Sequence, residues 1–166
     1  MATPSHPKRL ALDTNVLMDL ADRNAATQAF LEGFQARGYD LRVPPTVLVE
    51  LAHFAKHGTG EKQRLSTVAL KSLQDWKITP VLLSEIERKS AQNFGRIVHE
   101  RKLLPAAEIH DIDILAQTAL ANIPALVTSD VALLEADQDG LSVAFADGGL
   151  PAVRVVHPAR MARALR

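Results

Sequence analysis

The chain alternates short apolar runs with longer stretches in which apolar residues recur at helical spacing, and this alternation limits its fold more than any other feature. Parallel strands need a long crossover connection, usually a helix, whereas antiparallel strands can follow one another through short turns. The alternation therefore predicts an α/β fold with a mostly parallel, open sheet covered by helices on both faces. The expected strands are residues 10–12, 41–43, 77–83, 125–128 and 153–156.

Helices are expected between these strands, and recognisable first-turn residues precede several of them. After the Pro44-Pro45 pair, Thr46 is expected to cap a helix that runs to about residue 57. Ser84 and Glu87 have the spacing of a capping box, which predicts a helix toward residue 101. The other expected helices are residues 14–20, 61–76 and 105–122, the last opened by Pro105.

A chain of 166 residues with 47% hydrophobic composition can bury about two thirds of its unfolded surface. We therefore expect a single domain over residues 1–166, with a core at about residues 8–157 and a basic tail at residues 158–166. The sequence has no cysteine, which excludes disulfides and thiolate chemistry and is typical of a cytoplasmic protein. Asp13 interrupts the first apolar run, so neither a signal peptide nor a membrane span is expected there.

The 19 basic and 19 acidic side chains balance, so no overall field draws the chain to nucleic acid or to an anionic membrane. Their distribution along the chain is uneven: residues 105–150 carry eight acidic side chains and no lysine or arginine. The basic residues of 88–102 fit either contact with a phosphate backbone or the polar face of a helix. The four arginines of residues 151–166 fit either a contact surface for RNA or a partner, or an ordinary charged terminus.

Four carboxylates are candidates for one site. Asp13 and Asp130 each follow an expected strand, and ligands of open α/β sheets bind at the carboxyl ends of the strands. Glu50 and Asp111 lie on expected helices. Clustered carboxylates raise one another's pKa unless protons or cations neutralise them. A hard divalent ion such as Mg²⁺ or Mn²⁺ takes oxygen ligands and can activate water for phosphodiester cleavage.

These residues fall in four segments that together resemble the PIN-domain family. Residues 12–17, LDTNVL, are similar to the opening motif of that family, and residues 49–51, VEL, to its acidic position on a later helix. Residues 111–120, DIDILAQTAL, resemble its third motif, and residues 126–130, LVTSD, match its fourth. The order and spacing of the four motifs are more specific than any one of them.

The resemblance implies a three-layer α/β/α fold and an acidic pocket for Mg²⁺ or Mn²⁺. It also implies endoribonuclease activity, as in VapC-type toxins and enzymes that process ribosomal RNA. An RNA substrate, an antitoxin protein and a homodimer are the partners that such a family member would have. The sequence leaves open whether the substrate is RNA or DNA, because it carries no motif that reads a nucleic-acid sequence.

Carried onto this chain, the resemblance makes Asp13 and Asp111 the central metal ligands, while Glu50 and Asp130 complete the pocket directly or through water. The supporting positions are Thr14, Asn15, Thr128 and Ser129.

The third motif leaves a choice between Asp111 and Asp113, which lie about 200° apart on a helix and cannot easily bind one ion. Helical periodicity does not decide between them, whereas the family spacing favours Asp111. Glu108, one turn earlier, lies on the same side as Asp111 and fits either a site residue or a first-turn acid that interacts with the helix dipole.

Simpler interpretations exist for single residues. Asp13 and Asp130 can each be a helix N-cap, and Glu50 and Asp111 can be surface acids, but four such residues at family positions favour a shared site. His53 and His57 have the spacing of zinc ligands without a third partner, so we interpret them as cations at a helix C-terminus. His110 is expected to face solvent, and Asp137, Asp139 and Gly140 indicate a solvated turn.

Two other functions remain as alternatives. One is a PIN-like module with weak catalysis that binds nucleic acid or protein. The other is a phosphatase of the haloacid-dehalogenase type, which needs a second aspartate two residues after the first, where this chain has Asn15.

Overall fold

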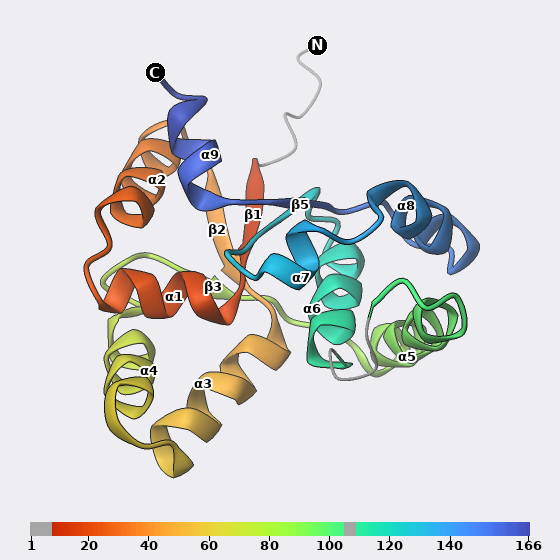
Figure 1. Ribbon diagram of the computed structural model, residues 1–166, viewed down its shortest axis with the longest axis horizontal. Coiled ribbons are helices and arrows are strands. Elements are labelled where there is room, and N and C mark those ends of the chain that lie inside the picture. The colour runs from red at the N-terminus through yellow and green to blue at the C-terminus, as the bar shows by residue number, and fades with distance from the viewer. Residues whose placement is uncertain (1–7, 105–108) are drawn as a thin grey trace.

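The computed structural model describes residues 8–104 and 109–166, and a five-stranded parallel sheet lies at its centre (Figure 1). The strands are β1 (Arg9–Leu12), β2 (Asp40–Val43), β3 (Thr79–Pro80), β4 (Ala125–Val127) and β5 (Arg154–Val156). Their order across the sheet is β3-β2-β1-β4-β5, and every pairing is parallel. The α/β class predicted from the alternation is confirmed, and the described sheet is wholly rather than mostly parallel.

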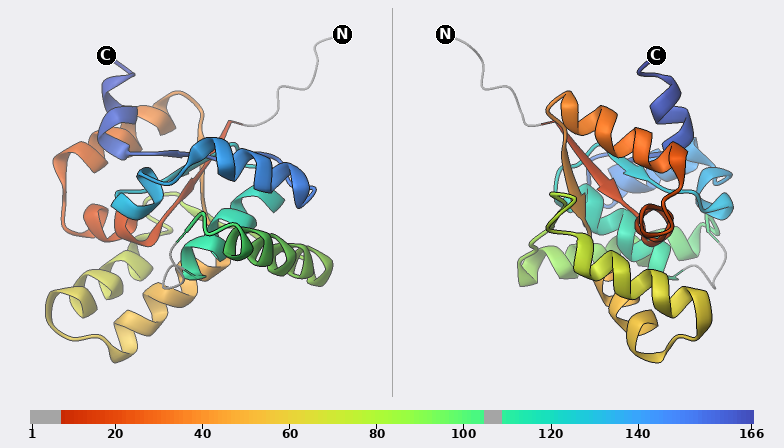
Figure 2. Two further views of the ribbon diagram at one scale, coloured as in Figure 1. Left: turned by 45° about the vertical axis from the view of Figure 1, so that its right-hand side comes forward. Right: turned by 90° about the vertical axis from the view of Figure 1, so that its left-hand side faces the viewer.

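Helices cover both faces of this sheet. One group packs together beside β1 and β2, and the other packs beyond β4, so the described chain forms three layers (Figures 1 and 2). The first group is α1 (Thr14–Ala21), α2 (Ala25–Ala36), α3 (Pro45–His57), α4 (Gly60–Ser72) and α9 (Pro158–Arg163). The second is α5 (Glu85–Glu100), α6 (Ile109–Leu120) and α8 (Gln138–Asp147), while the short α7 (Val131–Leu134) lies against β5.

The middle strand β1 forms the buried centre of the sheet. Leu10, Ala11 and Leu12 are buried, and β1 pairs with β2 on one side and β4 on the other. A parallel strand covered on both faces carries apolar side chains over its buried length, and in β1 only the first residue, Arg9, is charged. The chain therefore meets its first buried acidic residue, Asp13, only where the strand ends.

Several expected elements are present close to their predicted bounds. Ser84 accepts a hydrogen bond from the Glu87 backbone N–H, and the Glu87 carboxylate accepts one from the Ser84 N–H, which confirms the capping box. The expected strand at residues 77–83 is shorter, because only Thr79 and Pro80 pair as a strand, and Val81 adds one bond to Val43. The predicted start of the sixth helix at Pro105 lies outside the described residues.

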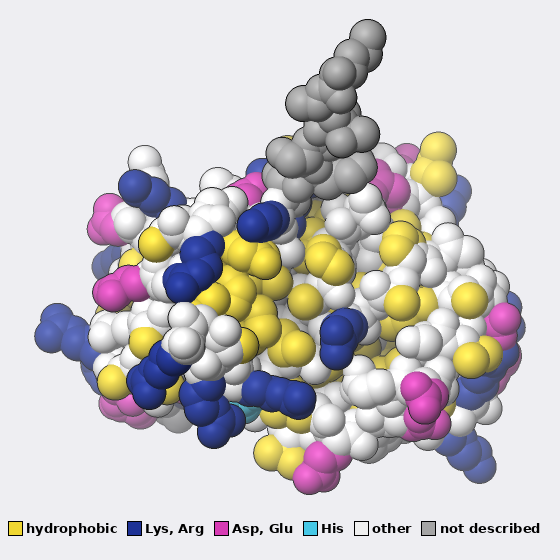
Figure 3. Space-filling model, turned by 90° about the horizontal axis from the view of Figure 1, so that it is seen from above, with side chains coloured by type: hydrophobic (Ala, Val, Ile, Leu, Met, Phe, Trp, Pro, Cys, Tyr) yellow, Lys and Arg dark blue, Asp and Glu magenta, His cyan; other side chains and the backbone are white. Residues whose placement is uncertain are grey.

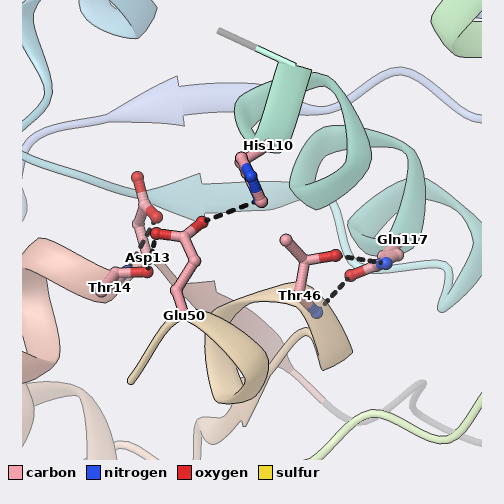
Figure 4. A network of polar contacts seen from close by, with 6 residues as sticks. All are labelled: Asp13, Thr14, Thr46, Glu50, His110 and Gln117. Atoms are coloured by element: carbon pink, nitrogen blue, oxygen red, sulfur yellow. Dashed lines mark hydrogen bonds and ion pairs between the residues drawn. The ribbon is translucent and has the colours of Figure 1, made fainter. Parts of the chain in front are cut away.

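Thr46 does not cap α3, because the helix begins at Pro45 and its N-cap is Pro44. Instead, the Thr46 backbone N–H donates to Gln117 Oε1 at 3.0 Å, and Thr46 Oγ1 accepts from Gln117 Nε2 at 2.8 Å (Figure 4). The pair joins the first turn of α3 to α6. This contact between segments far apart in sequence has no local sequence signal.

The solvated turn expected after residue 136 is wrong, because Asp137 caps the helix α8. Leu141, Ala144 and Phe145 are buried on one side of α8, and the Phe145 ring stacks on Phe94 of α5 at a centroid distance of 4.5 Å. The polar residues that suggested a turn lie in the first turn of the helix, where Asp137 satisfies a backbone N–H. The expected basic tail also contains a helix, α9, which packs on α2.

The two ends of the sheet differ in character. The end from which the N-terminus emerges presents lysine and arginine side chains around exposed hydrophobic ones (Figure 3). At the other end, where β1 and β4 finish, α3 and α4 lie side by side and extend away from the sheet (Figures 1 and 2). Within residues 8–104 and 109–166, no helix is both long and apolar enough to cross a membrane.

Candidate metal centre

The strands β1 and β4 end beside each other, and this brings two motifs more than a hundred residues apart in sequence into contact. Leu12 pairs with Val127, and the Asp13 backbone N–H donates to the Val127 carbonyl at 3.0 Å. Each strand then turns directly into a helix, with Asp13 capping α1 and Asp130 capping α7. The simple N-cap interpretation is therefore correct for both residues, and it does not exclude a second role.

Asp13 is the most buried of the four candidate carboxylates, with 3% of its surface exposed. Its Oδ1 accepts from the Thr14 backbone N–H at 2.7 Å, and its Oδ2 accepts from Thr128 Oγ1 at 2.7 Å. The pKa of Asp13 is raised to about 6, chiefly by burial and also by the charges of Glu50 and Asp130, against the lowering effect of these two hydrogen bonds. The side chain is thus held firmly in a place that disfavours its own charge.

The residues predicted as supporting positions form one network around Asp13. Asn15 Nδ2 donates to Thr128 Oγ1 at 3.1 Å, and Asn15 Oδ1 accepts from the Ser129 backbone N–H at 3.0 Å. Thr128 Oγ1 also accepts from the Asp130 backbone N–H at 3.0 Å. Asn15 therefore ties the loop after β1 to the loop after β4, which is a positioning role that a second aspartate could not fill, because it lacks the amide donor.

Glu50 reaches this network from α3. Its Oε2 accepts from Thr14 Oγ1 at 3.1 Å, and His110 Nδ1 lies 3.9 Å from its Oε1 (Figure 4). The Thr46–Gln117 pair fixes the start of α3 against α6 and so sets the distance between Glu50 and the β1 end. His110 is exposed, as expected, but its ring also faces Glu50.

The two aspartates of the third motif lie in different places. Asp111 is buried, with 9% exposure, and lines a small hollow of about 190 Å³ together with Asp13, Glu50 and Asp130. Asp113 lines a separate groove between α5 and α6, where burial raises its pKa. The structure therefore brings Asp111, and not Asp113, to the other candidates. Glu108 lies outside the described residues.

The hollow also contains residues that the sequence analysis did not select. Lys62, Phe54 and Met18 line it, and a wider hollow of about 710 Å³ continues from it over Val49 and His53. Lys62 and Phe54 had no signal in the sequence beyond their helical spacing. Only the packing of α3 against α4 brings them to the carboxylates.

The donor set of the hollow fits a hard divalent cation, because four carboxylates line it and supply oxygen ligands. The side chains do not converge, however: in the described part of the chain, no three acidic or histidine groups are arranged to hold an ion. Glu50 is turned to Thr14, and Asp130 Oδ1 accepts from the Leu133 N–H at 3.2 Å. Binding of an ion requires these two side chains to rotate.

Comparisons with known proteins identify the family and the fold. A family model described as the PIN domain matches residues 10–138. A crystal structure of VapBC2 from Rickettsia felis, bound to a DNA fragment from their promoter, aligns with a TM-score of 0.63 and 15% identity. That alignment covers 90% of this chain and 98% of the other.

Two further structures have the same fold. A structure of FitAB bound to an IR36 DNA fragment aligns with a TM-score of 0.54 and 17% identity, over 90% of this chain and 95% of that one. FitAcB from Neisseria gonorrhoeae aligns with a TM-score of 0.52 and 18% identity, over 90% and 97%. At such identities the likeness shows the fold alone. No curated protein matches the chain by sequence.

Proposed function

This chain belongs to the PIN-domain family, whose members are generally nucleases, and we propose that it is a cytoplasmic, metal-dependent endoribonuclease. The observation that carries the proposal is the gathering of Asp13, Glu50, Asp111 and Asp130 around one hollow at the carboxyl end of the sheet. Four acids from four separate segments meet there, although their mutual repulsion destabilises the fold. A metal site explains why they meet.

In this proposal Asp13 and Asp111 hold the ion most directly, since both are buried at the base of the hollow. Glu50 and Asp130, which are half-buried, complete the site from its rim. Mg²⁺ or Mn²⁺ bound there would neutralise the carboxylates. It would also polarise a phosphoryl oxygen and lower the pKa of a water molecule, and phosphodiester hydrolysis requires both effects. Thr128 and Asn15 keep Asp13 in one orientation through the hydrogen bonds described above.

The toxin of a toxin–antitoxin pair is the physiological role that we propose with this activity. The similar structures are VapBC2 and FitAB, each bound to a DNA fragment, and our proposal includes an antitoxin protein and a homodimer as partners of this chain. Induced expression of this chain should arrest growth, and Asp13→Asn should remove the arrest at equal protein level. Arrest by the variant would contradict the role as a nuclease toxin.

Cleavage of a panel of single-stranded and structured RNAs tests the enzymatic proposal, with Mn²⁺, with Mg²⁺ and with chelator. Cleavage that requires the ion and is lost in Asp13→Asn, with matching single-stranded DNA left intact, is the expected result. Full activity of Asp13→Asn, or cleavage that persists in chelator, would contradict it. Absence of any cleavage would favour the alternative of a binding module.

A further inference from the structure

The wider hollow extends the acidic site along α3 to the first turn of α4. Its volume of about 710 Å³ is much larger than one or two hydrated ions need. It is within the range of pockets that enclose a small organic ligand or a nucleotide. Its far wall is formed by His53, Phe54 and Lys62, and the carboxylates form the near wall.

Lys62 is placed there by a tight connection. Gly58 leaves no room for a Cβ, which would lie 2.4 Å from the Phe54 carbonyl oxygen, and Gly60 has a φ of +59°, a left-handed conformation that favours glycine. The turn returns the chain at once, so that Gln63 Nε2 donates to the Ala55 carbonyl at 3.2 Å. Lys62 Nζ then lies 3.9 Å from the centroid of the Phe54 ring.

The ammonium group of Lys62 is available for a ligand. Among the described residues that line the two hollows, it is the only lysine or arginine, and it has no salt bridge to a described carboxylate. The neighbouring Arg64 is instead paired with Glu61 and Asp22. A cation over an aromatic face is held in position while its outer hydrogens stay free to donate.

We propose that Lys62 and His53 form the substrate-binding wall of this site, with Lys62 as its contact to a backbone phosphate and His53 as its contact to an unpaired base. This proposal rests on the nuclease function proposed above. Lys62 donates to a backbone phosphate, which offsets the repulsion between the polyanion and the carboxylates. The exposed His53 ring, 5.9 Å from Phe54 by centroid, offers a face for an unpaired base, while Phe54 positions Lys62.

A single strand is favoured over a duplex for two reasons. The wall projects one ring and one cation beside a hollow of nucleotide size, and a base reaches such a ring only when it is unpaired. A duplex needs a broad basic surface for both backbones. Among the described residues that line the two hollows, Lys62 is the only lysine or arginine, so the wall itself does not supply such a surface.

The test is the binding of a short fluorescent single-stranded oligoribonucleotide by the full chain at several salt concentrations, in the Asp13→Asn background to avoid cleavage. Adding Lys62→Gln should raise Kd about tenfold and reduce the slope of log affinity against log salt by about 0.7, because one phosphate contact is lost. Adding His53→Ala should raise Kd about tenfold with the slope unchanged, because stacking releases no counterions.

Matched controls lie outside both hollows. Lys71→Gln removes an exposed lysine from the last turn of α4, and His99→Ala removes an exposed histidine from the last turn of α5, so both should leave Kd and slope unchanged. A duplex of the same sequence should bind more weakly. An unchanged Kd and slope in Lys62→Gln would overturn the proposal, as would a duplex that binds as tightly as the single strand.

A second measurement separates this proposal from simpler roles. If Lys62 only neutralises the carboxylates, Lys62→Gln in the otherwise unaltered protein will tighten Mn²⁺ binding and leave RNA affinity unchanged, which overturns the substrate role. If the protein cleaves no RNA but Lys62→Gln and His53→Ala still change binding as expected, the nuclease function fails and the binding wall stands. If the unaltered protein cleaves RNA but neither variant changes RNA binding, the nuclease function stands and the proposed binding wall is wrong.

Discussion

The two sides of the acidic hollow are built differently. On the sheet side, Asp13, Asn15 and Thr128 hold one another through buried hydrogen bonds, and both loops are anchored by strands. On the helical side, Glu50 accepts one side-chain hydrogen bond, from Thr14. Lys62 Nζ lies over the Phe54 ring and has no salt bridge to a described carboxylate. A site that must fix an ion and also admit a long flexible substrate benefits from one rigid wall and one adaptable wall.

The largest effect should follow from a change at the centre of the rigid wall. Asp13→Asn is expected to lower cleavage by about 100-fold or more, because it removes a ligand charge at almost constant volume. The variant keeps the bond that its side-chain oxygen accepts from the Thr14 N–H and loses the one from Thr128, so the fold should persist. Steady-state cleavage with circular dichroism of the same sample checks both parts. A variant that is folded and fully active would show that the rigid wall has no part in catalysis.

The same variant should stabilise the metal-free protein at neutral pH. The pKa of Asp13 in the folded protein is about 6, above the ordinary aspartate value of 3.8 that applies to the unfolded chain. The folded protein therefore binds this proton more tightly than the unfolded chain does, and it loses stability as the pH rises from about 4 to about 6. At pH 7 the unaltered protein has lost roughly 3 kcal/mol of stability in this way. Asp13→Asn removes this loss but also removes hydrogen bonds that the carboxylate accepts, so its net gain in stability is smaller. Denaturant unfolding of both proteins at pH 4 and pH 7, in chelator, should show a gain for Asp13→Asn only at pH 7.

Thr128→Val should have the next largest effect on activity. It leaves Asp13, Asn15 and the Asp130 N–H without a shared hydroxyl, and loss of such a positioning contact typically lowers metal affinity 10- to 100-fold. Thr118→Val is the matched control, since the Thr118 hydroxyl is equally buried but donates only to Ile114 of its own helix. Calorimetric Mn²⁺ affinity should fall for the first variant and stay constant for the second.

Glu50→Gln tests the adaptable wall. Because Glu50 must rotate from Thr14 to reach an ion, we expect cleavage to fall only about tenfold, a loss of about 1.4 kcal/mol of transition-state stabilisation. Rate measurements across Mn²⁺ concentrations should recover part of the loss at high concentration. A loss as large as that of Asp13→Asn would remove the distinction between the two walls.

Asp113→Asn should have the smallest effect. Its side chain lines the groove between α5 and α6 and not the hollow, although it lies only two residues from Asp111. Activity within about twofold of the unaltered protein is expected, against a large loss for Asp111→Asn. Equal losses in the two variants would mean that the helix turns to present either residue.

The sequence predicted the sheet well because strands depend on local patterns, and the structure places the four candidate carboxylates around one hollow. The apolar run of β1 and the acid that follows it can be read from a few neighbouring residues. The helices α2 and α8 were missed, although Phe30 and Phe34 in one and Leu141 and Phe145 in the other are spaced four apart and buried. In α8 the polar first turn concealed this signal, whereas no expectation was formed for residues 25–36.

What sequence reasoning could not supply is contact across the fold. Lys62 enters the hollow because α4 folds back on α3, and Gln117 fixes α3 because α6 crosses beside it. The choice between Asp111 and Asp113 likewise depends on which side of α6 faces the end of the sheet. Helical periodicity reveals none of these relations, and only the family spacing favoured Asp111 over Asp113.

The most direct test of the central claim, that the four carboxylates form one metal site, is calorimetric titration of the metal-free protein with Mn²⁺ beside Asp13→Asn and Asp113→Asn. The claim predicts saturable binding by the unaltered protein and by Asp113→Asn, with binding lost in Asp13→Asn. Binding of equal strength by Asp13→Asn, or none by the unaltered protein, would contradict it.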